Sequence, residues 1–278
     1  MLLGALVALS LIVGVVTCAA TGAFAAATWL WLLPVSALAS LLALLGLAFG
    51  FLMILCKRVD QSVPQEDDDP LYRKVTDLYI QSVLPVLQLH VKKKGMEKLP
   101  QDGRFMLVCN HCSLADPILL LYAMPQYQLA FISKRENAEL FVIGPMMHKI
   151  LCQLINREND REALKTILRC IQILKEDKAS IGVFPEGGIL SEDGKLHHFR
   201  PGVFKIAQKA NVPIVVCTMK NTLNAVPNLL HMKPTHVELS VLDVIPAEEL
   251  KGVTTVDIAD RCYRLMAEDL GPDLIAES

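Results

Sequence analysis

The sequence predicts an α/β layered domain with a mostly parallel central sheet, preceded by an N-terminal transmembrane helical hairpin. This prediction rests on two observations. The first 56 residues contain no Asp, Glu, Lys or Arg, so all 27 basic and 29 acidic side chains follow them. In the charged part, short apolar runs alternate with segments of helical periodicity, which is typical of strands and helices packed in layers.

The uncharged segment, residues 1–56, is long enough for two membrane spans, because one crossing needs about 20 apolar residues. Leu2 to Ala20 is the first candidate span, and Trp29 to Cys56 is the second. The small residues 21–28 between them suit a turn. A single tilted span with a re-entrant piece is the alternative. A secretory signal peptide does not fit, since it has a basic start and a shorter apolar stretch.

Positive charge closes the apolar segment at Lys57 and Arg58, and such charge favours the cytoplasmic side of a membrane. We therefore expect an integral protein of the cell membrane whose charged domain lies on the cytoplasmic face. Free thiols are the normal state of cysteines on that face, so we expect no disulfide among the eight cysteines of the chain. The net charge of −2 argues against general nucleic-acid binding, which usually requires a strongly basic domain.

A polar linker, residues 57–69, precedes the charged domain, residues 70–278. The linker ends in Asp69-Pro70, which is a typical helix start with Asp as the cap and Pro at the first helical position. Apolar side chains then recur at helical spacing within residues 70–90. Two placements suit this helix: it covers the core of the domain, or it lies on the membrane surface.

The rest of the domain shows the alternation on which the fold class depends. Apolar runs predict strands at 105–109, 129–132, 180–184, 213–218 and 236–244. Helical patterns predict helices at 160–175, 203–209 and 256–270.

The first candidate for chemistry is the segment 110–117, Asn-His-Cys-Ser-Leu-Ala-Asp-Pro, which directly follows a predicted strand. His111 titrates near neutrality and can take a proton from an alcohol. Asp116 can hold the other ring nitrogen, as the acid of a catalytic triad does. On a continuous helix the two side chains would lie roughly 140° apart, so a turn must separate them. Asp116-Pro117 also repeats the helix-start pattern, which leaves a capping role for Asp116 as the alternative.

Other chemistries in this segment are disfavoured. No GxSxG elbow surrounds Ser113, and the neighbouring Cys112 points away from His111 in an extended chain, which argues against covalent catalysis. Cysteines and histidines are present, but their spacing matches no recognised metal site. We therefore expect neither a metal nor a cofactor.

Two further segments carry residue types that bind ligands. Phe184-Pro185-Glu186-Gly187-Gly188 ends an apolar run, and the N–H groups of consecutive glycines can cradle an anion, although a plain turn is the alternative. Arg157 follows the apolar residues 150–155, and its planar guanidinium suits a phosphate, although a surface arginine is the alternative.

Taken in order, these segments resemble the PlsC-type glycerolipid acyltransferases, the family of lysophosphatidic acid acyltransferase. NHCSLAD at 110–116 matches that family's NHxxxxD motif, and LINR at 154–157 resembles its second motif, often FIDR. FPEG at 184–187 matches the start of the third motif, and Val-Pro-Ile-Val at 212–215 matches the fourth. The resemblance spans roughly residues 89–244.

The resemblance implies that His111 is the general base and Asp116 its orienting partner. It assigns substrate binding to Asn110, Arg157, Pro185, Glu186, Gly187, Gly188 and Pro213. The implied reaction moves a fatty acyl group from acyl-CoA or acyl-carrier protein to the free hydroxyl of 1-acylglycerol 3-phosphate and forms phosphatidic acid. The expected partners are therefore the acyl donor, the lipid acceptor and the membrane that holds it.

One departure from the family pattern affects the acceptor. The third motif commonly continues with Thr/Ser-Arg, but this chain has Gly188-Ile189, and Asn156 replaces the Asp of the second motif. Arg200, Lys195 or Lys205 would supply the missing charge, or the acceptor is another lysolipid, such as a lyso-ornithine lipid. A lipid or thioester hydrolase is a further alternative, because a His–Asp pair can also activate water. A non-catalytic lipid-binding module would not need the pair.

Overall fold

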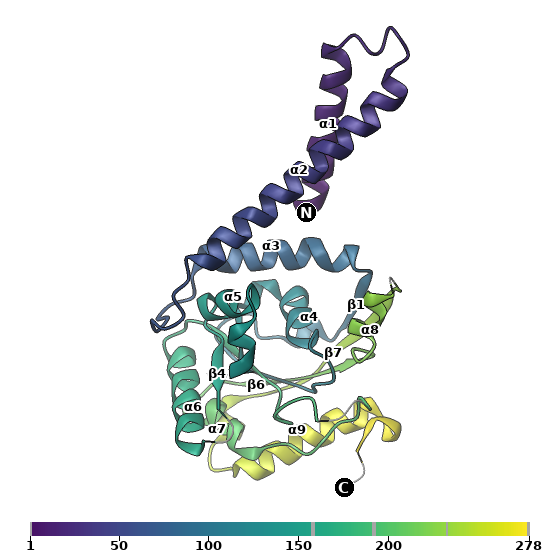
Figure 1. The fold of residues 1–278 in the computed structure, drawn as a ribbon. Helices are drawn as coiled ribbons and strands as arrows, with labels where there is room; N and C mark the ends of the chain where they lie inside the picture. The colour runs from purple at the N-terminus through teal and green to yellow at the C-terminus, as the bar shows by residue number, and fades with distance from the viewer. Residues whose placement is uncertain (1, 157–158, 191–192, 232, 277–278) are drawn as a thin grey trace.

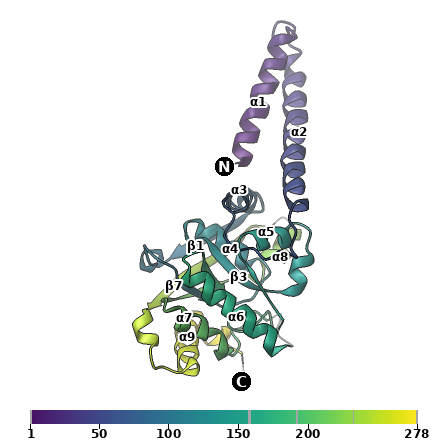
Figure 2. The same ribbon diagram turned by 90° about the vertical axis from the view of Figure 1, so that its left-hand side faces the viewer.

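The computed structural model describes residues 2–156, 159–190, 193–231 and 233–276. Two long N-terminal helices, α1 (Leu2–Ala20) and α2 (Trp29–Lys57), run antiparallel and project from the rest of the chain (Figures 1 and 2). Both are long and apolar enough to cross a membrane, and only 17% and 11% of their most apolar windows are buried. They are therefore not core helices of the α/β domain, and the hairpin prediction is confirmed.

Small residues let the two helices of the hairpin approach closely. A Cβ at Gly14 of α1 would lie 3.1 Å from the carbonyl oxygen of Leu33 and 3.2 Å from Cβ of Ala37 in α2. The hydroxyl of Ser40 donates to the carbonyl of Ser10 over 3.3 Å. Close packing of small residues is what holds apolar helices together in lipid, where no hydrophobic force drives them into contact.

The α/β domain contains a seven-stranded sheet with the strand order β1-β7-β6-β2-β5-β3-β4. Its strands are β1 (Leu89–Lys94), β2 (Met106–Cys109), β3 (Leu129–Lys134), β4 (Gln153–Ile155), β5 (Ser180–Val183), β6 (Ile214–Lys220) and β7 (Thr235–Ile245). Every neighbouring pair is parallel except β6 and β7, which are antiparallel. The mostly parallel sheet confirms the predicted fold class.

Two edge strands were missing from the prediction. The helix expected over residues 70–90 is α3 (Pro70–Val86), and the chain turns at Gln88 with φ 55° before β1 begins. β1 reads Leu-His-Val-Lys-Lys-Lys and has no apolar run, and β4 has only three residues. Both strands follow from pairing with a distant neighbour, β1 with β7 and β4 with β3, rather than from a local pattern.

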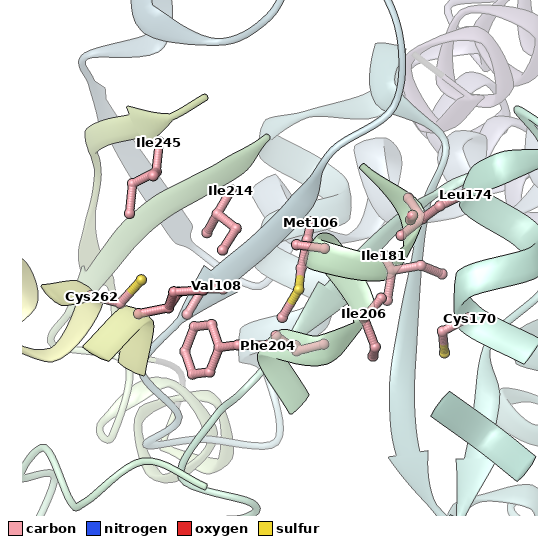
Figure 3. Packing of buried hydrophobic residues seen from close by; sticks show 14 of the residues in the cluster. Met106, Val108, Cys170, Leu174, Ile181, Phe204, Ile206, Ile214, Ile245 and Cys262 are labelled. Carbon is pink, nitrogen blue, oxygen red and sulfur yellow. The ribbon is translucent and has the colours of Figure 1, made fainter. Parts of the chain in front are cut away.

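Helices cover both faces of the sheet (Figures 1 and 2). On one face lie α6 (Asp160–Lys175), α7 (Lys205–Ala210) and α9 (Thr255–Leu270), whose apolar sides meet the sheet in a closed core (Figure 3). On the other face lie α3, α4 (Asp116–Ala123) and α8 (Ala225–Leu230). The helix expected at 203–209 begins instead as a 3₁₀ turn, Pro201–Phe204, before α7. The other 3₁₀ turns are Met96–Lys98, Pro125–Tyr127, Arg135–Glu139, Ala247–Leu250 and Pro272–Leu274.

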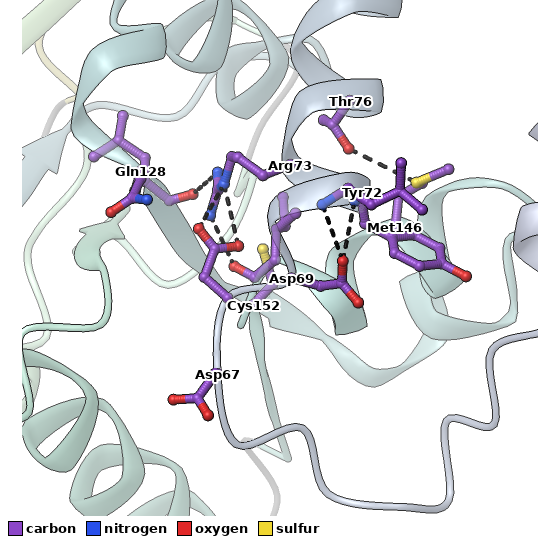
Figure 4. A network of polar contacts seen from close by, with 12 residues as sticks. Asp67, Asp69, Tyr72, Arg73, Thr76, Gln128, Met146 and Cys152 are labelled. Atoms are coloured by element: carbon purple, nitrogen blue, oxygen red, sulfur yellow. Dashed lines mark hydrogen bonds and ion pairs between the residues drawn. The ribbon is translucent and has the colours of Figure 1, made fainter.

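Helix α3 joins the hairpin to the domain. It lies across the base of the hairpin, and Leu84 packs in the core below it (Figures 1 and 2). The buried side chain of Arg73 donates to the carbonyls of Leu129 and Ile150 over 2.8 and 3.1 Å and pairs with Asp68 at 2.9 Å (Figure 4). These bonds satisfy the buried guanidinium and hold α3 on the sheet, so α3 covers the core.

Candidate active site

A histidine and an aspartate meet at the carboxyl end of β2. Nδ1 of His111 lies 2.9 Å from Oδ2 of Asp116. The imidazole also stacks on the ring of Phe184, with centroids 4.1 Å apart and planes at 17°. When Asp116 is ionised, its carboxylate only accepts hydrogen bonds, so a neutral His111 carries its proton on Nδ1 and its Nε2 is free to act as a base.

The loop between the two residues supplies the turn that the sequence required. Residues 110–115 form no helix, and α4 begins at Asp116 itself. Oδ2 of Asp116 accepts the backbone N–H groups of Cys112 and Ser113 over 2.8 and 2.9 Å, and the side chain makes no capping bond to α4. The alternative of Asp116 as a helix cap is therefore wrong, because the carboxylate points back into the loop.

Asn110 holds the end of β2 against β6. Its side-chain N–H donates to the carbonyl of Met219 over 2.9 Å, and its oxygen accepts the N–H of Met219 over 2.7 Å. The residue is buried, and both ends of its amide contact the backbone. This placement makes Asn110 a positioning residue for His111, in contrast to the substrate contact implied by the resemblance.

Glu186 connects the two loops of the site. Oε1 accepts the backbone N–H of His111 over 2.7 Å, and Oε2 accepts that of His197 over 3.0 Å. Burial raises the pKa of this carboxyl to about 7, although the two N–H groups partly oppose that rise. Since both oxygens contact the backbone, Glu186 positions the loops. The substrate binding implied for it by the resemblance has no exposed oxygen to support it.

The glycine of the third motif allows an arginine to approach. Gly187 has φ 85°, and a Cβ there would lie 2.7 Å from Nε of Arg200. The N–H of Arg200 donates to the carbonyl of Pro185 over 2.8 Å, which fixes the backbone beside the motif. The chain therefore brings a guanidinium to the place where the sequence lacks the arginine expected at Ile189.

An apolar cavity of about 650 Å³ lies beside His111. Its walls come from the end of α2, from α3, α4, β3 and α5 (Ile143–Lys149), and from residues 183–185 and 187–189. Pro185, Gly187 and Gly188, to which the family resemblance assigns substrate binding, line the cavity. Its lining cations among the described residues are Lys134 and Arg200.

Two predicted site residues fall elsewhere. Pro213 precedes β6, and its carbonyl accepts the N–H of Met106 at the start of β2. Since β2 and β6 are parallel, Pro213 lies at the end of the sheet opposite His111 and does not line the site. Arg157 lies outside the described residues.

The sequence reasoning missed most of the cavity wall. Phe184 and Phe131 stack with centroids 5.9 Å apart and fix the plane on which His111 rests. Lys134 and the residues of α3 and α5 also contribute, although none belongs to a motif. For Lys134, the only feature of the sequence that could have indicated a place at the site was its position just after the end of a predicted strand. Within the described ranges, no group of three or more His, Cys, Asp or Glu side chains is arranged to hold a metal.

Comparison with known proteins shows which proteins this chain resembles in sequence and fold. A model of the acyltransferase family matches residues 90–220, which contain the His–Asp loop and the third motif. A 1-acyl-sn-glycerol-3-phosphate acyltransferase of Chlamydomonas reinhardtii is 30% identical over 187 residues, which cover 66% of this chain and 54% of the relative. The α/β domain of this chain is therefore similar to the acyltransferases over these residues.

A bacterial protein and a solved structure are also similar to this chain. The 1-acyl-sn-glycerol-3-phosphate acyltransferase of Bacillus subtilis is 34% identical over 125 residues, 45% of this chain and 60% of that protein. The chain thus spans about half of the algal relative and three-fifths of the bacterial one. A crystal structure of PlsC, the 1-acyl-sn-glycerophosphate acyltransferase of Thermotoga maritima, has a TM-score of 0.61 at 21% identity and covers 80% of this chain and 86% of its own. That likeness shows the acyltransferase fold.

Proposed function

We propose that this protein transfers a fatty acyl group from acyl-CoA or acyl-carrier protein to the free hydroxyl of 1-acylglycerol 3-phosphate, forming phosphatidic acid. The observation that carries this proposal is the His111–Asp116 pair beside an apolar cavity that extends to Leu52 of α2. A base beside a lipid-sized apolar space suits an acyl acceptor with a long chain. The names of the relatives support the same acceptor.

The chain's own residues are sufficient for direct transfer. Nε2 of His111 takes the proton of the acceptor hydroxyl as its oxygen attacks the thioester carbonyl. The C–O bond forms, the C–S bond then breaks, and the imidazolium returns the proton to the leaving thiolate. A thioester is already activated, so the reaction needs a base, alignment and charge stabilisation, and it requires no cofactor.

Two charges develop in this reaction, a positive one on the imidazole of His111 and a negative one on the carbonyl oxygen of the thioester, and the site offers a partner for each. Asp116 is fully buried beside the imidazole, and its Oδ1 has no hydrogen-bond partner among the described residues. An ionised carboxylate at this place stabilises the imidazolium that forms. Gly188 is buried and lines the cavity, and its backbone N–H is the donor we assign to the carbonyl oxygen of the thioester.

Arg200 is the residue we assign to the phosphate of the acceptor. It lines the cavity beside Gly187 and can bond two phosphate oxygens at once. Removing a charge-assisted bond costs about 1.5–3 kcal/mol, or roughly 10- to 100-fold in binding. Arg200→Ala should therefore raise the KM for the acceptor by that factor and leave the KM for the acyl donor nearly unchanged. Lys205→Ala is the matched control, because Lys205 is a nearby exposed cation that does not line the cavity.

The hairpin supports a location of this reaction at a membrane. We infer an integral protein of the cell membrane with the α/β domain on the cytoplasmic face, because Lys57 and Arg58 follow α2 directly. Labelling of engineered surface cysteines in intact cells tests the orientation. Reaction with an impermeant reagent applied outside would contradict the cytoplasmic side.

Product analysis tests the activity. The full-length protein in detergent is given labelled acyl-CoA, or acyl-carrier protein, with a panel of lysolipids, and we expect labelled phosphatidic acid from 1-acylglycerol 3-phosphate. Release of free fatty acid alone would indicate a hydrolase. The apolar Ile189 in the lining favours a second candidate, acylation of a lysolipid with a larger head group or of a lyso-ornithine lipid. Faster turnover of such an acceptor would replace the phosphatidic acid assignment and keep the chemistry at His111.

A further inference from the structure

An exposed apolar segment follows β3, in residues 140–143. The side chains of Leu140, Phe141 and Ile143 are 47%, 58% and 43% exposed. Large apolar side chains that are exposed side by side indicate a contact with another apolar phase. Leu140 and Ile143 also line the cavity beside His111, whereas Phe141 does not, so the segment forms a rim of the cavity and the Phe141 ring lies outside its lining.

The segment lies beside the end of α2. The side chain of Gln61, just after α2, donates to the carbonyl of Ala138 over 3.2 Å. Val142 packs against the cluster of buried residues that includes Leu52 and Leu55 of α2. Figures 1 and 2 both show α5, which begins at Ile143, next to the end of α2 nearest the domain.

Hydrogen bonds hold the backbone of this segment in a fixed turn. The N–H of Leu140 donates to the carbonyl of Asn137 over 3.3 Å, and that of Gly144 donates to the carbonyl of Leu140 over 2.8 Å. A Cβ at Gly144 would collide with the carbonyl of Ala138, so glycine permits the tight turn. The apolar side chains are thus presented on a fixed turn, and ordering them costs little entropy on binding.

The lengths of the helices place this turn at the membrane boundary. α1 has 19 residues and is therefore about 28 Å long, so nearly all of it is needed to cross a hydrocarbon core of about 30 Å. Its first residue meets α3, where the N–H of Leu2 donates to the hydroxyl of Ser82 over 3.0 Å. α2 has 29 residues, about 43 Å, so its last turns extend beyond the core into the interface, and the segment packs against these turns.

We propose that residues 140–143 insert into the surface of the bilayer that holds the hairpin, as a second membrane contact at the rim of the cavity. The occupant of this apolar surface is lipid, because the surface packs against the end of α2 and that helix ends in Lys57 and its cap residue Arg58, whose charges suit lipid head groups. A lipid acceptor then enters the cavity without crossing water. This inference rests on the membrane anchoring proposed above.

Tryptophan quenching by brominated phosphatidylcholine in proteoliposomes tests the insertion with the full chain. The chain has two tryptophans, Trp29 and Trp31, both in the hairpin, so quenching of the wild type reports the anchor. In a Trp29→Phe/Trp31→Phe background, Phe141→Trp should be quenched to a similar degree. Val256→Trp in the same background is the control, because Val256 is 52% exposed on α9, at the far side of the domain from the hairpin (Figures 1 and 2).

The outcomes separate the anchor from the loop. Absence of quenching in the wild type would overturn the anchor and, with it, this inference. Quenching of the wild type but not of Phe141→Trp would overturn this inference alone. Quenching of Val256→Trp equal to that of Phe141→Trp would also overturn it, because the effect would not be specific to the rim.

A kinetic experiment tests what the contact does. Phe141→Asp should raise the KM for an acceptor embedded in vesicles about tenfold, because a charge replaces a ring that partitions into lipid. The turnover of a short-chain, water-soluble acceptor should stay unchanged, since Phe141 does not line the cavity. Val256→Asp should change neither value. A Phe141→Asp variant with wild-type KM for the embedded acceptor would contradict the proposal, as would an equal loss with both acceptors.

Discussion

The sequence Asp-Pro occurs at the start of two helices, and the two aspartates do different things. Asp69 accepts the N–H groups of Leu71 and Tyr72 over 3.1 and 3.3 Å and caps α3. Asp116 makes no capping bond and instead holds Nδ1 of His111 and two N–H groups of the loop before it. The side chain of Asp69 is 27% exposed, whereas that of Asp116 is 0% exposed.

The difference lies in the position of each residue relative to its helix. Asp69 precedes the first helical residue, so its carboxylate faces the free N–H groups of the first turn. Asp116 is the first residue of α4, and the loop of residues 110–115 folds back beneath it. A local helix-start pattern is thus compatible with both roles, and the neighbouring loop decides between them.

Removing the base should have the largest effect on activity. His111→Ala should lower kcat by about 10²–10⁴-fold, because a positioned base contributes a factor of that size. The variant should keep its melting temperature within a few degrees, which thermal unfolding in detergent checks. More than a tenth of wild-type turnover would show that His111 is not the base.

Replacing each aspartate with asparagine tests the comparison directly. Asp116→Asn should lower kcat by about 10- to 1,000-fold, because an amide cannot stabilise an imidazolium by charge. Asp69→Asn should leave kcat unchanged, since asparagine caps a helix as well as aspartate does. Initial rates of the two purified variants, measured side by side, give the result. Equal activity of the two variants would remove Asp116 from the catalytic pair.

Glu186 is a third carboxylate that accepts backbone N–H groups, and its ionisation should depend on folding. Burial raises its pKa in the folded state to about 7, from an ordinary value of 4.5. Between these values the folded protein binds more protons than the unfolded chain. The stabilisation that protonated Glu186 gives to the folded state is therefore fully present below about pH 4.5 and is lost as the pH rises through 7. The melting temperature of the wild type, relative to that of Glu186→Gln at the same pH, should therefore fall between pH 5 and pH 8.

Comparing the wild type with Glu186→Gln at each pH cancels the effect of the other titrating groups. Burial also raises the pKa of Asp68 and Asp77, but both are present in the two proteins and cancel in the difference. A difference that is constant over this pH range would show that Glu186 is ionised throughout.

Removing the cap of α3 should have the smallest effect. Asp69→Ala should lower the free energy of unfolding by about 1 kcal/mol, since two N–H groups of the first turn lose their acceptor. The kcat of the folded protein should not change, because Asp69 lies outside the cavity lining. Unfolding curves and initial rates measure the two effects separately. A loss of kcat like that of Asp116→Asn would contradict the separation of the two roles.

Patterns with a local cause were predictable. Residues 160–175 form a helix with the predicted bounds, because their apolar side chains recur at helical spacing and Asn159 caps them. The charge-free start of the chain predicted the hairpin, since nothing in it favours water. The NHxxxxD spacing identified His111 and Asp116, and the turn that must lie between them is present.

Long-range contacts decided the rest. β1 is a strand because it pairs with β7, and the charged sequence Lys92-Lys93-Lys94 gives no sign of this pairing. Pro213 belongs to a matching motif, but the parallel register of β2 and β6 puts it at the far end of the sheet.

The sequence by itself determined the division into an apolar hairpin and an α/β domain, and it determined which two residues form the candidate base and its partner. Only the tertiary structure decided that Asp116 faces His111 and that Arg200 reaches Gly187. It also placed α2, α3 and α5 around one cavity. The physical reason is that periodicity and capping act over a few neighbouring residues, whereas a buried carboxylate or an apolar wall takes its role from groups tens of residues away in the chain.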